Sequence, residues 1–267
     1  MRILLTLLFN EKSKQVMKNR FSNQIAIITG GARGIGKGIA KRLAKEGAAV
    51  YIFDIRMEEL KQTITEFKSQ KLAIKGRLLD ITKEQKIKKA IQKITKKHQR
   101  LDIMINCAGI TGETGKNIVN YPTANFLKTM EINLTGAFLM TKYSIPPMLK
   151  NNYGRIIHLT SVGGKEGNPN MVGYAASKAG LFGLIKGVGK EYAESGITVN
   201  GIAPAVIATD LNEKTDPKVL QYMINKIPMK RLGTVEEVAN LCCWIASKEA
   251  SFNTGFVFDL TGGRATY

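Results

Sequence analysis

The chain has 267 residues, of which 44% are hydrophobic and 23% charged, a composition typical of an ordered globular protein. It is long enough for one large domain or two small ones, and its composition excludes collagen-like, fibrous and disordered chains. Lys and Arg number 40 against 21 Asp and Glu, and the resulting net charge of +19 makes nucleic acid, an anionic lipid surface and an acidic carrier protein candidate partners.

Residues 1–21 are predicted to be an N-terminal extension, either disordered or the product of a mis-assigned start. The first nine residues are apolar apart from Arg2 and Thr6, but the polar and basic residues that follow contain no small-residue cleavage site of a secretory signal. Met17 lies eight residues before the first predicted strand and is a second candidate start. No apolar run reaches the roughly 18 to 20 residues that a spanning helix needs, so we expect no membrane insertion.

From residue 22 onward, short apolar runs alternate with amphipathic segments, which is the pattern of parallel βαβ units. Strands are predicted at residues 25–29, 49–54, 73–80, 103–106, 155–161, 197–203 and 255–260. Helices are predicted at residues 35–46, 56–69, 84–98, 124–151, 174–195 and 235–246. Because no linker or repeat divides the chain, residues 22–267 are predicted to form a single α/β domain, a doubly wound (Rossmann) parallel seven-stranded sheet with helices on both faces.

The first predicted strand runs directly into Thr29-Gly-Gly-Ala-Arg-Gly-Ile-Gly36, after which a helical pattern begins. Glycines at such a junction permit a tight turn and a close approach of the backbone to a pyrophosphate, towards which the helix N-terminus directs its free N–H groups. We therefore predict a dinucleotide site here; a merely flexible turn is the alternative.

Asp54 closes the second predicted strand, eighteen residues after Gly36. A carboxylate at this place accepts the hydroxyl groups of the adenosine ribose and repels a 2′-phosphate, so it favours NAD over NADP. Arg33, Lys37 and Arg56 act in the opposite direction, and NADP is the less favoured alternative.

Asp80, Ile81 and Thr82 follow the third predicted strand, where they can meet the adenine edge of the cofactor. Helix capping by Asp80 or Thr82 is the alternative, and it is compatible with cofactor binding.

The densest run of positive charge, Lys83 to Arg100, coincides with the third predicted helix. Its apolar residues recur at helical spacing, which places the lysines on an opposite, solvated face. These apolar residues are Ile87, Ala90, Ile91 and Ile94. Since the remaining charge is spread along the chain, nucleic-acid binding is a less favoured alternative.

Three cysteines, Cys107, Cys242 and Cys243, form neither an even set nor a Cys-x-x-Cys pair, and the chain has only two histidines. This pattern supports neither a disulfide framework nor a zinc site, so we expect no bound metal. Free thiols fit a reducing compartment, and we expect a cytoplasmic protein.

Four polar residues form a candidate catalytic set. Tyr174 and Lys178 are four residues apart in a predicted helix, so they share one face, and the cation would bring the phenol pKa down from its ordinary value near 10. Ser161 lies thirteen residues before Tyr174, at the carboxyl end of a predicted strand, where an open parallel sheet binds ligands. Asn133 lies inside an otherwise helical stretch. Asn is unfavourable within a helix because its side chain competes for backbone hydrogen bonds, so its presence indicates a kink or a bound water.

The glycine-rich turn, Asn106-Cys-Ala-Gly109, Asn133, Ser161 and Tyr174-x-x-x-Lys178, in this order and spacing, resemble the classical short-chain dehydrogenase/reductase family from about residue 22 to the C-terminus. Within this family, the sequence resembles the 3-oxoacyl-acyl-carrier-protein reductase-like branch and the sugar or polyol dehydrogenase branch. Two positions depart from the family pattern: Cys107 stands where Asn is usual, and Ala205 stands where Gly usually follows Pro204. The first change removes an amide that braces the central strand, and the second adds a Cβ beside the nicotinamide.

The resemblance implies hydride transfer between a nicotinamide and a carbonyl or secondary alcohol. Tyr174 is then the general acid or base, and Ser161 hydrogen-bonds the substrate oxygen. Lys178 lowers the Tyr174 pKa and holds the nicotinamide ribose, while Asn133 positions a water that relays protons to Lys178. The implied cofactor-binding residues are Gly30, Arg33, Gly34, Ile35, Gly36, Asp54, Ile55, Asp80, Ile81, Asn106, Ala108, Gly109, Tyr174, Lys178, Pro204, Ile207 and Thr209.

The predicted walls of the substrate pocket are residues 110–115, 163–171 and 209–227, the last of which could close as a lid. They are rich in Thr, Glu, Lys and Asn, which favours a small polar substrate such as a sugar, polyol or hydroxy acid. A 3-oxoacyl-acyl-carrier-protein reductase is the alternative, and the positive charge suits an acyl carrier protein. Such reductases usually place arginines where this chain has Asn152, Tyr153 and Ser195, and they usually prefer NADPH. An alternative of another class is a basic nucleic-acid-binding or NAD-sensing protein without turnover.

The helices predicted at 124–151 and 174–195 are apolar over much of their circumference, which predicts packing against a second copy of the chain. The family resemblance implies a homotetramer, and the C-terminal segment from Gly255 to Tyr267 could form a further contact. We also expect Arg264, in that segment, to reach a neighbouring active site.

Overall fold

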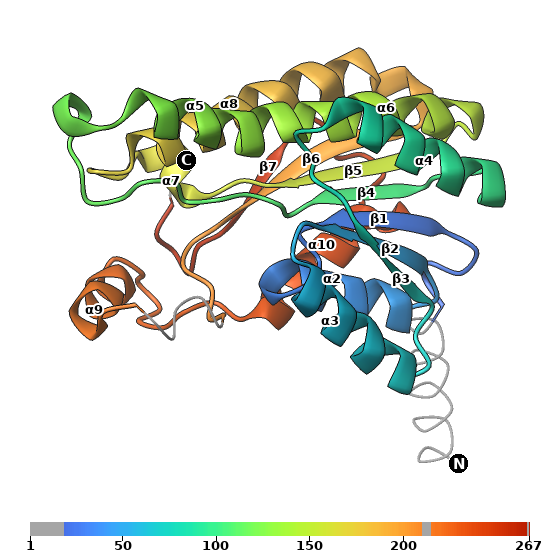
Figure 1. Cartoon of the computed structure of the whole chain (residues 1–267), viewed down its shortest axis with the longest axis horizontal. Helices are drawn as coiled ribbons and strands as arrows, with labels where there is room; N and C mark the ends of the chain where they lie inside the picture. Colours follow the sequence, from blue (N-terminus) through green and yellow to red (C-terminus); the bar gives the residue numbers. More distant parts are fainter. Residues whose placement is uncertain (1–18, 210–214, 266) are drawn as a thin grey trace, which may run out of the picture.

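The computed structural model describes residues 19–209, 215–265 and 267, so most of the predicted N-terminal extension lies outside the described residues. Seven parallel strands form one sheet in the order β3-β2-β1-β4-β5-β6-β7 (Figure 1), as predicted. Strands β2 and β3 lie on one side of β1, and β4 to β7 lie on the other. The direction in which strands are added therefore reverses between β1 and β4, which creates a topological switch point. The strands are β1 (Ile25–Thr29), β2 (Ala49–Asp54), β3 (Ile74–Leu78), β4 (Ile103–Asn106), β5 (Gly154–Leu159), β6 (Ile197–Pro204) and β7 (Val257–Leu260).

Helices cover both faces of the sheet (Figure 1). One face is covered by α2 (Gly34–Lys45), α3 (Met57–Ser69) and α10 (Val235–Ala246). The other is covered by α4 (Glu84–His98), α5 (Thr123–Met130), α6 (Gly136–Lys150) and α8 (Val172–Glu191). Two shorter helices, α7 (Val162–Glu166) and α9 (Pro217–Asn225), lie beyond the carboxyl ends of the strands. Single 3₁₀ turns occupy Ile118–Asn120, Ala193–Ser195 and Lys248–Ala250.

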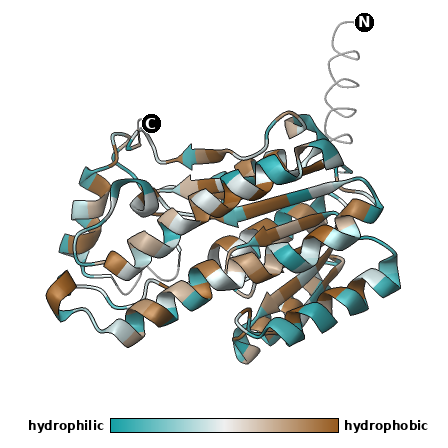
Figure 2. Ribbon diagram, turned by 90° about the horizontal axis from the view of Figure 1, so that it is seen from above, coloured by the Kyte–Doolittle hydropathy of each residue, from teal (hydrophilic) through white to brown (hydrophobic). Residues whose placement is uncertain are grey.

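The core consists of two apolar layers, one on each side of the sheet. Alternate residues of β1, such as Ile27 and Ile28, belong to opposite layers and are fully buried. The central strands β1, β4, β5 and β6 are buried along their whole length, because helices cover them on both faces. In Figure 2, hydrophobic residues follow the strands and hydrophilic residues the outer surfaces of several helices. The prediction for α4 is confirmed: Ile87 and Ile94 are buried, and no lysine of this helix is.

Three predicted strands are longer than the observed ones. The third prediction covered 73–80, but pairing with β2 stops where Asp54 meets Leu78, so Asp80 lies in the following loop. The prediction 155–161 ends at Leu159 in the structure, which leaves Ser161 outside the strand. The prediction 255–260 starts too early, because Gly255 has a φ of 71° and pairing with β6 begins at Val257. Apolar runs reveal buried segments but not where a hydrogen-bonded ladder ends.

The long helix predicted at 124–151 is interrupted at the residue that the sequence singled out. Glu131–Thr135 forms a π-helical turn between α5 and α6, and the fully buried Asn133 lies in its centre. A π turn widens a helix locally and is frequent at functional sites. The sequence inferred a kink or a bound water at Asn133, and the structure shows an interruption of the α-helix there in the form of a π turn.

Two helices at the carboxyl edge were not predicted. Helix α7 begins at once after Ser161 and has only five residues. Helix α9 lies inside the stretch 209–227 that was interpreted as a lid, of which residues 210–214 lie outside the described residues. Its start carries a recognisable signal, because Asp216 accepts the Lys218 N–H at 2.7 Å and Pro217 occupies the first turn.

No helix in the described part of the chain is long and apolar enough to cross a membrane. Within the same residues, no group of three or more His, Cys, Asp or Glu side chains could hold a metal ion. The three cysteines are free thiols.

Candidate active site

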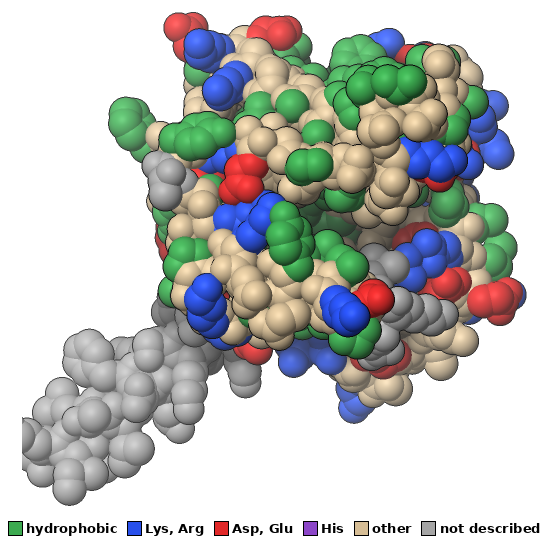
Figure 3. Space-filling model, turned by 90° about the vertical axis from the view of Figure 1, so that its left-hand side faces the viewer, with side chains coloured by type: hydrophobic (Ala, Val, Ile, Leu, Met, Phe, Trp, Pro, Cys, Tyr) green, Lys and Arg blue, Asp and Glu red, His purple; other side chains and the backbone are tan. Residues whose placement is uncertain are grey.

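The carboxyl ends of β1, β4 and β5 bring together the glycine turn, Asn106 and Ser161. These segments are far apart in the sequence, but their strands are neighbours in the sheet. The ligand site of an open parallel sheet lies at this edge, beside the switch point. Figure 3 looks onto this side of the molecule, where basic, acidic and apolar side chains are interspersed.

The glycine turn requires glycine for two reasons. Gly30 and Gly34 have φ values of 63° and 52°, which side chains disfavour. A Cβ at Gly30 would come within 2.9 Å of the Ala108 backbone, and one at Gly36 within 2.3 Å of the Gly30 carbonyl oxygen. Helix α2 then starts with Arg33 as an N-cap without a side-chain hydrogen bond, and its first turn contains no acidic residue. The glycines thus allow a tight turn packed on the Ala108 backbone, and the uncapped helix N-terminus provides free N–H groups that could bind a pyrophosphate.

Thr29 connects this turn to the loop after β4. Its Oγ1 donates to Asn106 Oδ1 at 2.6 Å and accepts the Ala108 N–H at 3.1 Å. Cys107, between them, packs against the core on the α2 side of the sheet, and burial raises the pKa of its thiol to about 12. Cys107 therefore contributes packing as a protonated thiol in place of the usual amide.

Asp54 is 7% exposed, and both of its carboxylate oxygens are engaged. One accepts the Ala32 N–H of the glycine turn at 3.0 Å, and the other accepts the Arg56 N–H at 3.0 Å. Ile55, between Asp54 and Arg56, is 64% exposed. The carboxylate is thus held beside the phosphate-binding turn.

Asp80 and Thr82 do not cap α4, because the N-cap residue is Lys83 and it has no side-chain hydrogen bond. Asp80 Oδ1 instead accepts from the Thr82 N–H and hydroxyl, both at 2.9 Å. Ile81, between them, is buried, and its side chain would meet a Cβ added at Gly136. The capping alternative is wrong.

Tyr174 and Lys178 lie one turn apart on α8, as predicted, with Lys178 Nζ 5.7 Å from the centre of the Tyr174 ring. Lys178 is 6% exposed, its Nζ donates to the Leu159 carbonyl at 2.7 Å, and burial lowers its pKa to about 8. Burial raises the pKa of Tyr174, and a hydrogen bond with Ser161 opposes that rise. The hydroxyl groups of Ser161 and Tyr174 are therefore neighbours, with a buried cation beside the phenol.

Asn133 hydrogen-bonds the π turn to the loop after β4 and to α8. Its Oδ1 accepts the Ile110 N–H and its Nδ2 donates to the Ile110 carbonyl, both at 2.8 Å, while Nδ2 also donates to Ser177 Oγ at 2.9 Å. Ser177 Oγ in turn donates to the Tyr174 carbonyl at 2.8 Å. A Cβ at Gly109 would lie 3.1 Å from Asn133 Oδ1 and 3.5 Å from Lys178 Nζ, so these groups are adjacent. Sequence reasoning missed Ser177, whose only signal was its place beside Lys178.

The segment after β6 approaches the glycine turn from the opposite side. Pro204 ends β6, and the Ala205 N–H donates to the Leu260 carbonyl at 3.0 Å. Thr209 Cγ2 would lie 3.7 Å from a Cβ at Gly34. Ile207, between them, is buried and bridges to Gly233. The residues predicted to contact a nicotinamide therefore lie across from those predicted to bind its pyrophosphate.

Arg264 binds within its own chain, where its Nη2 lies 2.6 Å from a Glu166 carboxylate oxygen. Its reach to a neighbouring active site stays a prediction. The predicted walls 110–115 and 163–171 do meet, because the Gly115 N–H donates to the Asn170 carbonyl at 3.1 Å.

A family model described as enoyl-(acyl carrier protein) reductase matches residues 30–264. The chain belongs to the short-chain dehydrogenase/reductase family. It is 40% identical to 2-dehydro-3-deoxy-L-rhamnonate dehydrogenase (NAD(+)) of Sphingomonas sp. (strain SKA58), over 94% of this chain and 99% of that relative. It is 36% identical to a 3-oxoacyl-acyl-carrier-protein reductase of Thermotoga maritima, over 91% and 98% of the two chains. The structure of NAD⁺-bound xylitol dehydrogenase superposes with a TM-score of 0.86 at 28% identity, covering 91% of this chain and 99% of that one.

These similarities confirm the fold and the family inferred from the sequence. This short-chain dehydrogenase/reductase is an NAD(P)-dependent oxidoreductase, as predicted.

Proposed function

We propose that this short-chain dehydrogenase/reductase transfers a hydride between NAD(H) and a carbonyl or secondary alcohol of a small polar substrate, of the sugar-acid or polyol type. The observation that carries the proposal is the contact of Ser161 with Tyr174 beside the buried Lys178. Similarity to an NAD(+)-dependent sugar-acid dehydrogenase and to a xylitol dehydrogenase supports the substrate class.

The residues present fit a dinucleotide. Gly30 and Gly36 let the turn pack directly on the Ala108 backbone and on itself, immediately before α2. The free N–H groups at the start of α2 can then bind a pyrophosphate. Asp54 would hold the adenosine ribose, and Lys178 the nicotinamide ribose. When bound, NAD(H) supplies the hydride donor or acceptor.

The surroundings of Asp54 support NAD over NADP. Two of the three cations that could neutralise a 2′-phosphate have carboxylate partners of their own. Lys37 Nζ lies 2.6 Å from a Glu66 carboxylate oxygen, and Arg56 Nη1 lies 3.4 Å from Glu59 Oε1. These two cations therefore do not neutralise the Asp54 carboxylate. Its negative charge would repel the 2′-phosphate of NADP.

Tyr174 would exchange a proton with the substrate oxygen. Burial alone raises its pKa, so a stabilising cation is needed for the phenolate to form at neutral pH. With a pKa of about 8, Lys178 is mostly protonated at pH 7 and supplies that charge from the same helix. The Ser161 hydroxyl would donate to the substrate oxygen while negative charge develops there. Asn133 would fix the geometry by bracing Ser177 and Ile110; the water relay implied for it would use its backbone, since its side-chain groups are already bonded.

The alternative is a 3-oxoacyl-acyl-carrier-protein reductase, which the 36% identity to the Thermotoga maritima enzyme supports. Two positions count against it. Asn152 and Ser195, where such reductases usually carry arginines, are neutral, and Asn152 is exposed. An acidic acyl carrier protein would therefore meet fewer positive charges at these two positions than it meets on such a reductase.

The assay follows absorbance at 340 nm with purified protein. NAD⁺ and NADP⁺ are each offered with a panel of sugar acids, polyols and hydroxy acids, and NADH and NADPH with an acetoacetyl thioester. We expect NAD⁺ reduction with a member of the polar panel. Rapid oxidation of NADPH by the thioester, with an inactive polar panel, would favour the carrier-protein alternative.

We further propose a cytoplasmic homotetramer. Apolar side chains remain exposed on α5 and α6, including Leu127 (60%), Phe138 (46%) and Leu149 (43%), which supports packing against another copy. Light scattering that gives the mass of a monomer would contradict this assembly.

The alternative of another class is a nucleic-acid-binding protein without turnover. Salt-sensitive binding to duplex DNA, together with no turnover in the 340 nm assay, would support that alternative.

A further inference from the structure

The segment between Ser161 and Tyr174 forms the substrate side of the proposed site. It starts at Ser161, whose Oγ accepts the Gly163 N–H at 3.0 Å, and continues through α7. Gly164 packs so closely on α8 that an added Cβ would come within 2.8 Å of the Lys178 carbonyl carbon. The position of α7 is thus coupled to Ser161 at one end and to Lys178 along its side.

Residues 261–265 and 267, which we call the C-terminal strap, hold α7 from the outside. Arg264 Nε and Nη2 donate to the same Glu166 carboxylate oxygen at 3.0 and 2.6 Å, and Nε also lies 3.2 Å from the second oxygen. The Arg264 side chain is only 7% exposed, whereas that of Glu166 is 29% exposed, so the guanidinium is held in a nearly buried place by a partly exposed carboxylate. Figure 1 shows the C-terminus beside α7.

Lys165 provides a second attachment. Its Nζ donates to Asp259 Oδ2 at 2.7 Å and to the main-chain carbonyl oxygen of Tyr267. The Tyr267 hydroxyl donates back to the Lys165 carbonyl at 3.0 Å. Consecutive residues of α7 are therefore fastened to the end of β7 and to the strap.

The strap also contacts the segment that follows α9. The Met229 N–H donates to the Gly262 carbonyl at 3.1 Å. Gly262 has a φ of 59°, and a Cβ there would come within 2.7 Å of Ile227 Cγ2. The strap thus bridges two of the predicted walls of the substrate pocket.

We propose that the C-terminal strap is a positioning element for the substrate, which acts through the Arg264–Glu166 pair by fixing the segment between Ser161 and Tyr174. This inference rests on the proposed function of that site. Arg264 is a positioning residue: it binds α7 and need not touch the substrate. The glycine turn and Asp54 belong to other strands, whereas Lys178 on α8 adjoins α7, so we expect the strap to affect substrate binding more than cofactor binding.

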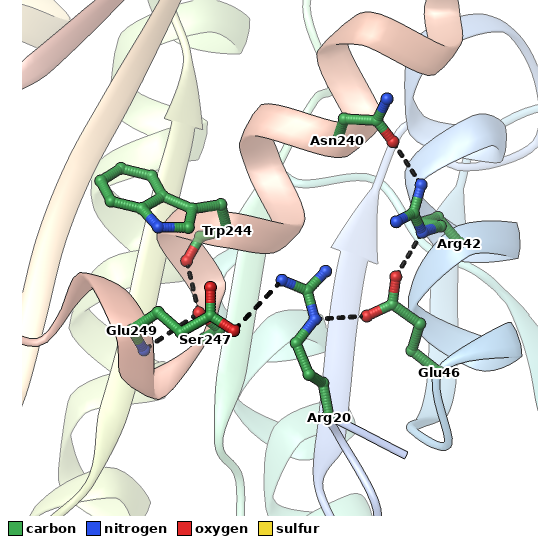
Figure 4. A network of polar contacts seen from close by, with 7 residues as sticks. All are labelled: Arg20, Arg42, Glu46, Asn240, Trp244, Ser247 and Glu249. Atoms are coloured by element: carbon green, nitrogen blue, oxygen red, sulfur yellow. Dashed lines mark hydrogen bonds and ion pairs between the residues drawn. The ribbon is translucent and has the colours of Figure 1, made fainter. Parts of the chain in front are cut away.

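The test compares Arg264→Gln with a matched control, Arg20→Gln. Arg20 also forms an arginine–glutamate pair between distant segments, with its Nε 2.6 Å from Glu46 Oε2 and its side chain 15% exposed (Figure 4). That pair precedes β1, at the amino end of the sheet, far from α7. Both variants lose an arginine–glutamate ion pair with a largely buried arginine, but only Arg264→Gln loses an attachment of the strap to α7.

Two readouts are measured on both full-length variants. Amide hydrogen exchange of residues 162–171 is expected to accelerate about tenfold in Arg264→Gln and to stay at the wild-type rate in Arg20→Gln. The KM of the substrate identified in the 340 nm assay is expected to rise about tenfold in Arg264→Gln alone, with NADH affinity unchanged within about twofold. Exchanging the charges, Arg264→Glu with Glu166→Arg, is expected to recover part of both effects.

Unchanged exchange of residues 162–171 in Arg264→Gln would overturn the proposal, and so would faster exchange with an unchanged KM. If Arg264→Gln does not fold, Glu166→Gln tests the same pair. The exchange comparison needs no substrate. A wild-type protein without turnover would therefore refute the proposed function, while the exchange rates would still decide whether the strap holds α7.

Discussion

His158 makes the folded protein sensitive to acid. It is the last residue but one of β5 and is fully buried. Its Nε2 is 3.1 Å from Thr141 Oγ1, and its Nδ1 has no hydrogen-bond partner among the described residues. Burial, and secondarily the charge of Lys178, lower its pKa to about 3. The folded protein therefore keeps a neutral imidazole at pH values where an exposed one is charged.

The sign and size of the effect follow from linkage. In the unfolded chain His158 binds a proton near pH 6.5, whereas in the folded state it does so only near pH 3. Between these values the unfolded state holds more protons, so the free energy of unfolding falls as the pH falls. The slope approaches about 1.4 kcal/mol per pH unit below pH 6, and acidification from pH 7.5 to 5 removes about 2 kcal/mol.

The assay is urea unfolding of wild-type protein, His158→Asn and His98→Asn at pH values from 7.5 to 5. The chain has only these two histidines, and His98 is half-buried with its Nε2 2.7 Å from the Tyr51 hydroxyl. We expect His158→Asn to flatten the dependence of unfolding free energy on pH, and His98→Asn to change it less. Equal slopes in wild-type protein and His158→Asn would refute the reasoning.

Two further substitutions test the cofactor site. Gly36→Ala places a Cβ 2.3 Å from the Gly30 carbonyl oxygen, a clash with backbone that no rotamer relieves; we expect a loss of about 1–3 kcal/mol of stability and weaker NADH binding, measured by thermal unfolding and fluorescence titration. Wild-type affinity in this variant would contradict the assignment of the turn. Asp54→Asn removes the charge that opposes a 2′-phosphate, so kcat/KM with NADP⁺ relative to NAD⁺ is expected to rise about tenfold in steady-state assays. An unchanged ratio would show that Asp54 does not select the cofactor.

Much of the architecture was predictable because each strand is a short apolar run between turn residues. The predictions 25–29, 49–54, 103–106, 84–98 and 235–246 coincide with the observed elements. Helix α10 illustrates the reason: Thr234 and Glu237 form a capping box that marks its start in the sequence. Where a boundary depends on a neighbouring strand, as at Leu78, the sequence alone does not contain it.

As with the fold, part of the candidate site was predictable from the sequence. Tyr174, Lys178 and Asn133 carry local signals, namely helical spacing and an unfavourable residue inside a helix. The role of Ser177 was not predictable, because its partner Asn133 is 44 residues away and only folding brings them together. Arg264 likewise meets Glu166 across 98 residues, and no periodicity in either segment encodes that contact.

The central claim is that Tyr174 performs acid–base chemistry on a substrate held by Ser161. The most direct measurement compares wild-type protein and Tyr174→Phe for NAD⁺ reduction at 340 nm with the active member of the polar panel, after NADH binding has been confirmed for both. We predict that the variant binds NADH as the wild type does and that its kcat falls by about 10²-fold or more. Substantial turnover by Tyr174→Phe would contradict the account.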